Sequence, residues 1–169
     1  MIRPARPDDV AGLADVLVDC VAGGASVGFM HPFDHAQAVD FWTASLAGGD
    51  RGDRIVLLAD DPDGQVVGTV QVVFAGPDNQ PHRGDIAKML VHRRARRQGV
   101  GEALLQAAEA AALAAGRTLL VLDTASPDAE RLYARQGWQR VGEVPRFALW
   151  PGGGFVATTF FYKDLAAAL

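Results

Sequence analysis

The spacing of apolar residues divides the first part of the chain into a short extended run and two helical segments. Residues 2–5 are interpreted as a short first strand. Apolar side chains then recur three and four positions apart over residues 10–21 and again over residues 35–46, where Asp34 is placed to cap the helix. This part of the chain therefore predicts one strand followed by two helices.

The middle of the chain changes to the β-branched runs that are typical of strands. Two runs, residues 54–59 and 65–74, are separated by an aspartate-rich turn, which predicts an antiparallel hairpin. A third run over residues 85–92 leads into an alanine-rich helix over residues 99–115, and Gly116 is suited to end that helix.

The last part of the chain continues to alternate between strands and helices. A strand over residues 118–123 precedes a short helix that begins at Ser126, and two further strands are expected over residues 139–144 and 155–162. Because helices follow the central strands, those strands are expected to pair in parallel, while the hairpin is antiparallel. The order predicts a mixed α/β sheet of about seven strands, mostly antiparallel, with four helices on both faces.

Composition and charge limit the classes of function that fit this fold. The chain has 169 residues, of which 49% are apolar, and its formal net charge is -4, so no basic nucleic-acid footprint is present. A lone cysteine, Cys20, excludes an internal disulfide and fits a reducing compartment. Neither a signal peptide nor a membrane-spanning run is evident. We therefore expect one cytoplasmic domain over residues 1–169, without nucleic-acid or membrane partners.

The stretch directly before the alanine-rich helix carries the most informative chemistry. It reads Arg96-Arg97-Gln98-Gly99-Val100-Gly101 and follows two further arginines. The first N–H groups of a helix have no partner, the helix dipole adds positive charge, and glycines allow a ligand to approach the backbone. These features predict a phosphate or pyrophosphate site. The alternatives are a solvated basic turn and a nucleic-acid patch, but the patch lacks aromatic neighbours.

The motif narrows the identity of the phosphate ligand. A P-loop is excluded because neither Lys88 nor Lys163 lies in such a setting, and a dinucleotide fingerprint is excluded because its third glycine is replaced by Leu104. The remaining pattern, Arg/Gln-x-x-Gly-x-Gly after a strand, resembles the pyrophosphate motif of the GCN5-related N-acetyltransferases, the GNAT family. The order of elements resembles that fold along the whole chain.

The resemblance implies that acetyl-CoA is the co-substrate and that it lies in a cleft between two splayed strands, here residues 85–92 and 118–123. The pantetheine arm is then expected to pair with the backbone of Met89, Leu90 and Val91. An N–H group of Met89 or Leu90 is expected to donate to the thioester oxygen. The pyrophosphate is expected to bind Arg96, Arg97, Gln98, Gly99, Val100, Gly101 and Glu102.

The resemblance also implies catalytic residues, and no metal ion is expected among them. Tyr133 matches the tyrosine that points at the sulfur and is expected to be the general acid; its alternative role is a core tyrosine. Asp85 and Asp123 flank the cleft, and either is a candidate to bind or deprotonate the amine, directly or through water. Each aspartate could instead cap a helix or pair with an arginine.

A closer resemblance, to the tabtoxin-resistance acetyltransferase subfamily, rests on Leu122-Asp123-Thr124, residues 141–145 and Phe161-Tyr162-Lys163. The glycine-rich and aromatic loop over residues 24–33 echoes the same subfamily. This resemblance implies a small, amino-acid-like or toxin-like amine as the acceptor.

Three aromatic residues, Phe29, Trp42 and Phe147, are candidates to line an acceptor pocket, and their alternative role is to fill the core or anchor loops. Phe29 and Phe147 lie in predicted loops, and Trp42 lies on a predicted helix face. A sheet edge at residues 155–162 also makes a homodimer plausible. A non-catalytic acyl-CoA sensor or interaction module on the same fold is the alternative function.

Overall fold

The computed structural model describes residues 1–166 of the chain, so residues 167–169 of the predicted domain lie outside the described part. Its helices are α1 (Val10–Ala22), α2 (His35–Asp50), α3 (Val100–Ala114) and α4 (Pro127–Arg135), with 3-10 turns η1 (Pro7–Asp9) and η2 (Arg93–Ala95). Its strands are β1 (Ile2–Pro4), β2 (Arg54–Asp60), β3 (Val66–Phe74), β4 (Arg83–Val91), β5 (Leu119–Thr124), β6 (Gln139–Leu149) and β7 (Phe155–Asp164).

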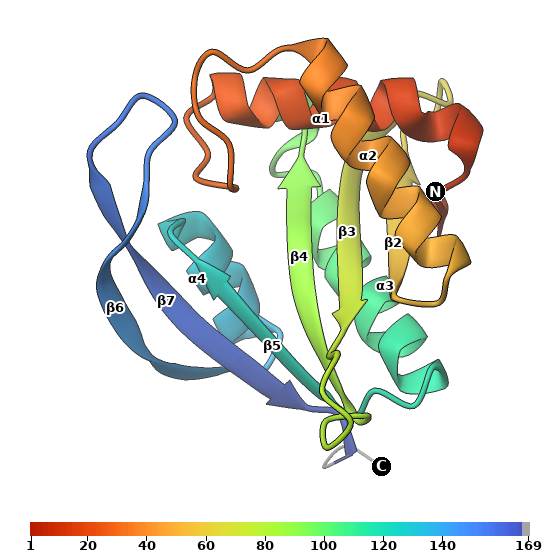
Figure 1. Cartoon of the computed structure of the whole chain (residues 1–169), viewed down its shortest axis with the longest axis vertical. Helices are drawn as coiled ribbons and strands as arrows, with labels where there is room; N and C mark the ends of the chain where they lie inside the picture. Colours follow the sequence, from red (N-terminus) through yellow and green to blue (C-terminus); the bar gives the residue numbers. More distant parts are fainter. Residues whose placement is uncertain (167–169) are drawn as a thin grey trace.

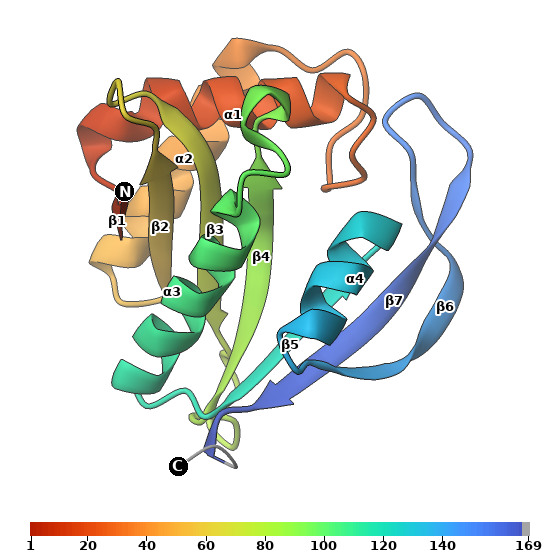
Figure 2. The ribbon, with the colours of Figure 1, turned by 180° about the vertical axis from the view of Figure 1, so that it is seen from behind.

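The strands form one 7-stranded mixed sheet in the order β1-β2-β3-β4-β5-β7-β6. Every neighbouring pair is antiparallel except β4 and β5, which are parallel. Helices α1 and α2 cover one face of β2, β3 and β4, and α3 and α4 lie on the opposite face (Figure 1, Figure 2). The arrangement confirms the predicted fold class. No helix within residues 1–166 combines the length and apolar character needed to cross a membrane.

The helix boundaries follow the capping residues that the sequence supplies. Asp34 caps α2 by accepting a hydrogen bond from the N–H of Gln37 at 2.9 Å, and the Gln37 side chain accepts one from the N–H of Asp34 at 2.9 Å. At the end of α3, Gly116 has a φ of +76°, a left-handed conformation that glycine adopts without steric cost. Both predicted boundaries are confirmed.

Strands β4 and β5 pair only over a short length and then separate. In their parallel register, Arg83 lies opposite Leu119, Gly84 opposite Leu120 and Asp85 opposite Val121. Beyond this point β5 leans away from β4 together with β6 and β7 (Figure 1). The open half of β4 therefore keeps a partner on the β3 side only, and the predicted splayed parallel pair is confirmed.

The last two strands differ from the prediction. Strand β6 extends to Leu149 rather than ending at Val144, because it resumes beyond a register shift at which Arg146 has a left-handed φ of +55°. Phe147 therefore lies in a strand and not in a loop. The predicted sheet edge at residues 155–162 is also wrong, since β6 folds back on β7 and takes the edge position.

Candidate active site

Helix α3 begins without a side chain that caps it. Its N-cap residue, Gly99, has a left-handed φ of +80° and offers no side-chain hydrogen bond. The first N–H group with an acceptor is that of Ala103, which donates to the carbonyl of Gly99 at 3.0 Å. The N–H groups of Val100, Gly101 and Glu102 consequently have no acceptor within residues 1–166 and point out of the helix end. With the helix dipole, these donors form a site suited to an anion.

Gly101 faces the place where α3, β4 and α4 approach one another. A Cβ atom there would lie 3.4 Å from Leu132, 3.6 Å from Met89 and 3.8 Å from Val91, all of them side-chain contacts. The first turn of α3 is therefore directed toward the open half of β4, and the absent side chain leaves its amides accessible.

The last two of the four arginines stand beside this helix end. Arg96 donates its Nε group to the carbonyl of Val91 at 3.2 Å, and Arg97 has a left-handed φ of +59° directly before the turn into α3. Neither side chain has a carboxylate partner in the described part of the chain. Their guanidinium groups can therefore add charged donors to the anion site.

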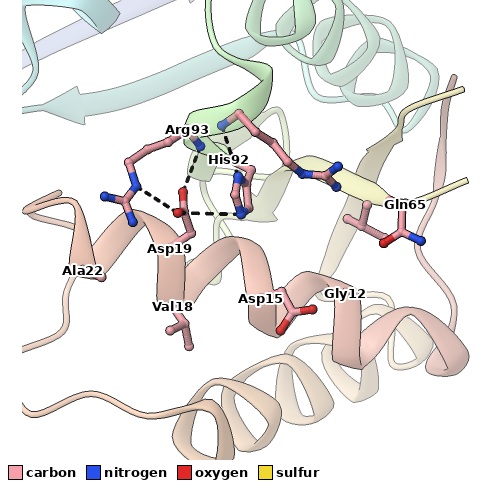
Figure 3. A pocket seen from close by; sticks show the side chains of 10 residues that line it. Gly12, Asp15, Val18, Asp19, Ala22, Gln65, His92 and Arg93 are labelled. Carbon is pink, nitrogen blue, oxygen red and sulfur yellow. Dashed lines mark hydrogen bonds and ion pairs between the residues drawn. The ribbon is translucent and has the colours of Figure 1, made fainter. Parts of the chain in front are cut away.

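The first two arginines have a different role, because carboxylates neutralise them. Arg94 pairs with Asp61 at 2.9 Å. Arg93 donates both its N–H and its Nε group to Asp19 at 2.8 Å, and the Nε2 atom of His92 lies 3.6 Å from the same carboxylate (Figure 3). Burial by itself would raise the pKa of Asp19, but the hydrogen bonds from Arg93 outweigh it and lower that pKa.

These pairs line a cavity of about 490 Å³ between α1, the start of β3 and η2 (Figure 3). Several of its polar groups are paired across it: Asp19 on α1 contacts Arg93 and His92 after β4, and the Nδ1 atom of His92 accepts a hydrogen bond from the N–H of Arg94 at 3.2 Å. These contacts therefore connect α1 to the end of β4. Arg93 and Arg94 are thus neutralised by carboxylates, and Arg96 and Arg97 remain available to a ligand. Half of the arginines of the nucleic-acid patch considered above are therefore already paired.

The open edge of β4 has a defined register. His92 donates its N–H to the carbonyl of Val67 on β3 at 2.9 Å. Because backbone groups alternate between the two edges of a strand, Leu90 is also directed toward β3, whereas Met89 and Val91 are directed toward β5. The structure thus separates the three candidate positions: the backbone of Met89 and Val91 faces the cleft, and that of Leu90 faces a partner strand.

Tyr133 lies on α4 with its ring enclosed, and its hydroxyl group has no hydrogen-bond partner among residues 1–166. The side chain is 4% exposed, and its ring centroid lies 5.8 Å from those of Trp138 and Phe161. Burial raises the pKa of the Tyr133 phenol, and the nearby negative charge of Asp123 raises it further. The phenol is therefore protonated at neutral pH and can donate a proton or a hydrogen bond.

The two candidate carboxylates have unlike surroundings. Asp85 lies where β4 and β5 are still paired, and it forms an ion pair with Arg83 at 2.6 Å. Asp123 lies further along β5, accepts a hydrogen bond from Thr158 at 2.6 Å and is exposed. The structure brings Asp123, and not Asp85, into the same electrostatic environment as Tyr133.

The three aromatic candidates also occupy unlike places. Trp42 is fully enclosed in the core between α1, α2 and the sheet, where its Nε1 group finds no acceptor among the residues that the structure describes. Phe29, in the loop before α2, has its ring centroid 4.5 Å from that of Phe33 and packs edge-on against Phe41 of α2 at 5.3 Å. Phe147 is 49% exposed on β6. Phe29 and Phe147 are accessible to an acceptor, whereas Trp42 supports the core.

Sequence reasoning missed one residue of β4, which lies on the face that α1 and α2 cover. Lys88 is half-buried and has a left-handed φ of +47°, and its ammonium group lies against Phe29 and Phe41. The sequence gives no signal for this placement, because a bulge in β4 turns the side chain away from the regular alternation. Within residues 1–166, no cluster of histidine, cysteine or acidic side chains has the composition to hold a metal ion.

Taken together, the splayed strands, the uncapped start of α3 and the phenol of Tyr133 form a site suited to a phosphate-bearing ligand that extends between β4 and β5. The sequence profile of the family described as "Acetyltransferase (GNAT) domain" matches residues 51–140. Because this match spans more than half of the 169 residues, the chain belongs to the GNAT family.

Solved structures share the fold at low sequence identity. The ribosomal-protein-alanine N-acetyltransferase from Brucella melitensis is 23% identical with a TM-score of 0.85, and the match covers 98% of this chain and 99% of that chain. A GNAT superfamily phosphinothricin acetyltransferase from Sinorhizobium meliloti, solved in complex with acetyl-CoA, is 19% identical with a TM-score of 0.83, covering 98% and 88%. An N-acetyltransferase from Staphylococcus aureus Mu50 is 18% identical with a TM-score of 0.83, covering 98% of both chains.

Proposed function

We propose that the chain is an acetyl-CoA-dependent N-acetyltransferase that acts on the primary amine of a small molecule by direct attack in a ternary complex. The observation that carries the proposal is the uncapped start of α3, whose free amides face the open half of β4. A diphosphate satisfies both the charge and the donors of that helix end. The residues present therefore fit coenzyme A.

The protein groups have distinct roles in this proposal. Acetyl-CoA supplies an acetyl group activated as a thioester. The amides of residues 100–102 hold the diphosphate, and Arg96 and Arg97 add charged donors. The Met89 backbone, which faces the cleft, is placed to donate to the thioester oxygen.

We assign the two proton transfers to Asp123 and Tyr133, because the charge of Asp123 acts on the Tyr133 phenol. The incoming amine must lose a proton before it can attack, because an ammonium group has no lone pair. Asp123 accepts this proton, directly or through a water molecule, since it is exposed and free of any arginine. Tyr133 is protonated at neutral pH and gives its proton to the departing thiolate.

A panel of small amines assayed with acetyl-CoA tests this function. We expect transfer to at least one amine, and we expect Tyr133→Phe to lower kcat by about 10²-fold with the affinity for CoA retained. Tyr162→Phe is the matched control, because this other tyrosine is 41% exposed on β7 and is expected to leave kcat unchanged. Near-normal turnover in Tyr133→Phe would remove its role. CoA binding without transfer to any amine would favour the sensor alternative.

We further propose an amino-acid-like or toxin-like acceptor, as the resemblance to the tabtoxin-resistance subfamily implies. The support is the set of matching segments in the sequence together with the accessible aromatic side chains of Phe29 and Phe147. One of the solved structures with a similar fold is described as a phosphinothricin acetyltransferase, so that protein is named after a small molecule. The amine panel therefore includes amino acids.

A homodimer through the edge strand β6 is a further proposal. The exposed apolar side chains of this hairpin include Val141 at 66% and Phe155 at 60%. An unpaired strand edge beside exposed apolar groups favours association with a second copy. Light scattering on the purified protein, with Val141→Lys as the disrupting variant, distinguishes dimer from monomer.

A further inference from the structure

Lys88 occupies a strained position that the reaction described above does not use. It lies in the bulge between β3 and β4 with a φ of +47°. A non-glycine residue in this region is strained, and such strain is concentrated at functional sites. On either side of the bulge, Ile86 packs in the core beneath α3 and Leu90 packs in the core beneath α1 and α2. The bulge thus directs Lys88 toward the face of the sheet that carries α1, α2 and the loop with Phe29.

The ammonium group of Lys88 is surrounded by aromatic rings rather than by acceptors. Its Nζ atom lies 5.6 Å from the ring centroid of Phe29 and 5.4 Å from that of Phe41. A Cβ atom on Gly28 would lie 3.8 Å from Nζ, so the loop before α2 closes over the amine without filling the space beside it. Within residues 1–166, Nζ has neither a carboxylate partner nor a hydrogen bond.

The other lysine of the chain shows what a structural lysine looks like in this protein. Lys163 is anchored by Glu109 at 2.6 Å and by the carbonyl of Gln136 at 2.8 Å. Both lysines are half-buried, yet only Lys163 has its donors satisfied. A half-buried cation is solvated less well than an exposed one, and the donors of Lys88 remain open to an anionic partner from outside the chain.

The charges around Lys88 point to the same kind of partner. Burial lowers its pKa and Arg54 adds to this effect, while the negative charge of Asp123 opposes it. In the described part of the chain Arg54 also lacks a carboxylate partner: its Nη1 group donates to Gln71 at 3.0 Å, and its Nε group has no acceptor there. Within residues 1–166, Lys88 and Arg54 are therefore two neighbouring cations without a carboxylate partner. Asp123 on β5 provides negative charge nearby.

We propose that Lys88 binds the carboxylate of the acceptor, so that the substrates are amines that carry a carboxylate, such as α-amino acids. This inference rests on the proposed acetyltransferase function. An amino acid presents opposite charges a few bonds apart, and its ammonium group near Asp123 would leave its carboxylate near Lys88. The carboxylate supplies the acceptor that Nζ lacks, and Phe29 and Phe41 exclude water from the pair.

The decisive kinetic experiment compares amino acids with their carboxamides, which retain the amine and lose the negative charge. We measure kcat/KM for each pair in wild type, Lys88→Met and Lys163→Met, corrected for the fraction of free amine. Wild type and Lys163→Met are expected to prefer the acid by roughly 10–100-fold. Lys88→Met is expected to lose this preference, chiefly through KM. Equal use of acid and amide by wild type, or an equal loss on both substrates in Lys88→Met, would overturn the inference.

A binding measurement separates this inference from the proposed function. Calorimetry with N-acetyl amino acids and their carboxamides, in the presence of CoA, requires no turnover. We expect at least about 10-fold tighter binding of the acids to wild type and no difference in Lys88→Met. Transfer only to amines without a carboxylate would refute the role of Lys88 and leave the enzyme assignment intact. Lys88-dependent binding of the acids without transfer to any amine would refute the assignment instead.

Mass spectrometry tests the competing role of Lys88 as a nucleophile. If Lys88 accepts the acetyl group itself, incubation with acetyl-CoA adds an acetyl group to its Nζ atom. The two lysines are Lys88 and Lys163, so peptide mapping identifies the site directly. We expect both to remain unmodified on the timescale of turnover, and acetylation of Lys88 would overturn its assignment as the carboxylate-binding residue.

Discussion

Two polar regions lie close to the end of β4, and they differ in how completely their groups are paired. In the paired cluster, formed by Asp19, His92 and Arg93, the Asp19 carboxylate lies 2.8 Å from Arg93 and 3.6 Å from the Nε2 atom of His92. In the open cluster, formed by Lys88, Tyr133 and the first amides of α3, the donors have no acceptor in the described chain. Both clusters contain buried polar groups, so burial alone does not distinguish them.

The difference separates groups that hold the fold from groups that are ready for a ligand. An unpaired buried donor costs free energy, and a fold retains it only when the loss is compensated elsewhere. In the paired cluster the compensation is internal and links α1 to the end of β4. In the open cluster water can take this part in the free protein, and we propose that a bound molecule replaces it: a diphosphate at α3, a thiolate at Tyr133 and a carboxylate at Lys88. Substitutions in the two clusters should therefore affect different measurements.

The largest expected effect is on turnover in Asp123→Asn. An amide cannot take up the proton of the incoming amine, so kcat should fall by about 10²–10⁴-fold while the Kd for CoA stays within about twofold. Steady-state kinetics and calorimetry measure the two quantities. Asp85→Asn is the matched control, because Asp85 is already paired with Arg83. An equal loss of kcat in Asp85→Asn would contradict the assignment of the base.

The next largest effect is on coenzyme affinity in Gly101→Val. A branched side chain would occupy the space between Met89 and Leu132 and cover the free amides of α3, so the Kd for CoA should rise by about 10–100-fold. Gly76→Val is the control, since a Cβ at Gly76 meets nothing within 4 Å. Unchanged CoA affinity in Gly101→Val, at an unchanged melting temperature, would place the diphosphate elsewhere.

In the paired cluster the expected effect is on stability and not on turnover. Asp19→Asn should lower the free energy of unfolding by about 1–3 kcal/mol, because residue 19 loses its negative charge and one of the two oxygens that accept from Arg93. This corresponds to about 2–4 °C in Tm for each kcal/mol in a chain of this size. The kcat of the folded variant should match wild type. A fall in kcat at full folding would show that the two clusters are not independent.

The pH dependence of this stabilisation follows from the lowered pKa of Asp19. The carboxylate is favoured in the folded state, so its contribution is complete above the pKa of the unfolded chain, near 4. It is lost as the pH falls through the lower folded value. The stability difference between wild type and Asp19→Asn should therefore be constant near neutrality and vanish in acid. Denaturant titrations at several pH values measure this difference.

The smallest effect should be a gain in stability in Lys88→Met. Removing a half-buried cation without a counterion should raise the free energy of unfolding at pH 7 by on the order of 1 kcal/mol. The folded pKa of Lys88 lies below its unfolded value, so the cost is fully present below the folded pKa and disappears near pH 10.5. The gain should shrink over that interval. A loss of stability in Lys88→Met would show that the amine is structural.

Much of the fold follows from local signals in the sequence. The cap at Asp34 and the left-handed glycine at residue 116 fix helix ends through contacts within a few residues. The strand runs and the arginine-glycine turn are likewise local patterns. The extension of β6 was not predictable, because Pro145 and Arg146 favour a break and the strand resumes only through its pairing with β7.

The site was predictable to the extent that its groups belong to one motif. The turn at residues 96–101 indicated the anion site, and the short helix carrying Tyr133 indicated the phenol. The position of Lys88 depends on a bulge that is set by pairing with β3, and the division of the arginines depends on acidic residues far away in the chain, Asp19 and Asp61. Such long-range contacts leave no periodic signal in the sequence.

The most direct test of the account is to observe the backbone amides at the start of α3 while CoA is added. In two-dimensional ¹H–¹⁵N NMR spectra, we expect the largest shifts at Gly99, Val100, Gly101 and Glu102, because these N–H groups gain the acceptor that the fold does not supply. The amides of Asp19 and Arg93 in the paired cluster should change little. CoA binding that leaves the four α3 amides unperturbed would contradict the central claim.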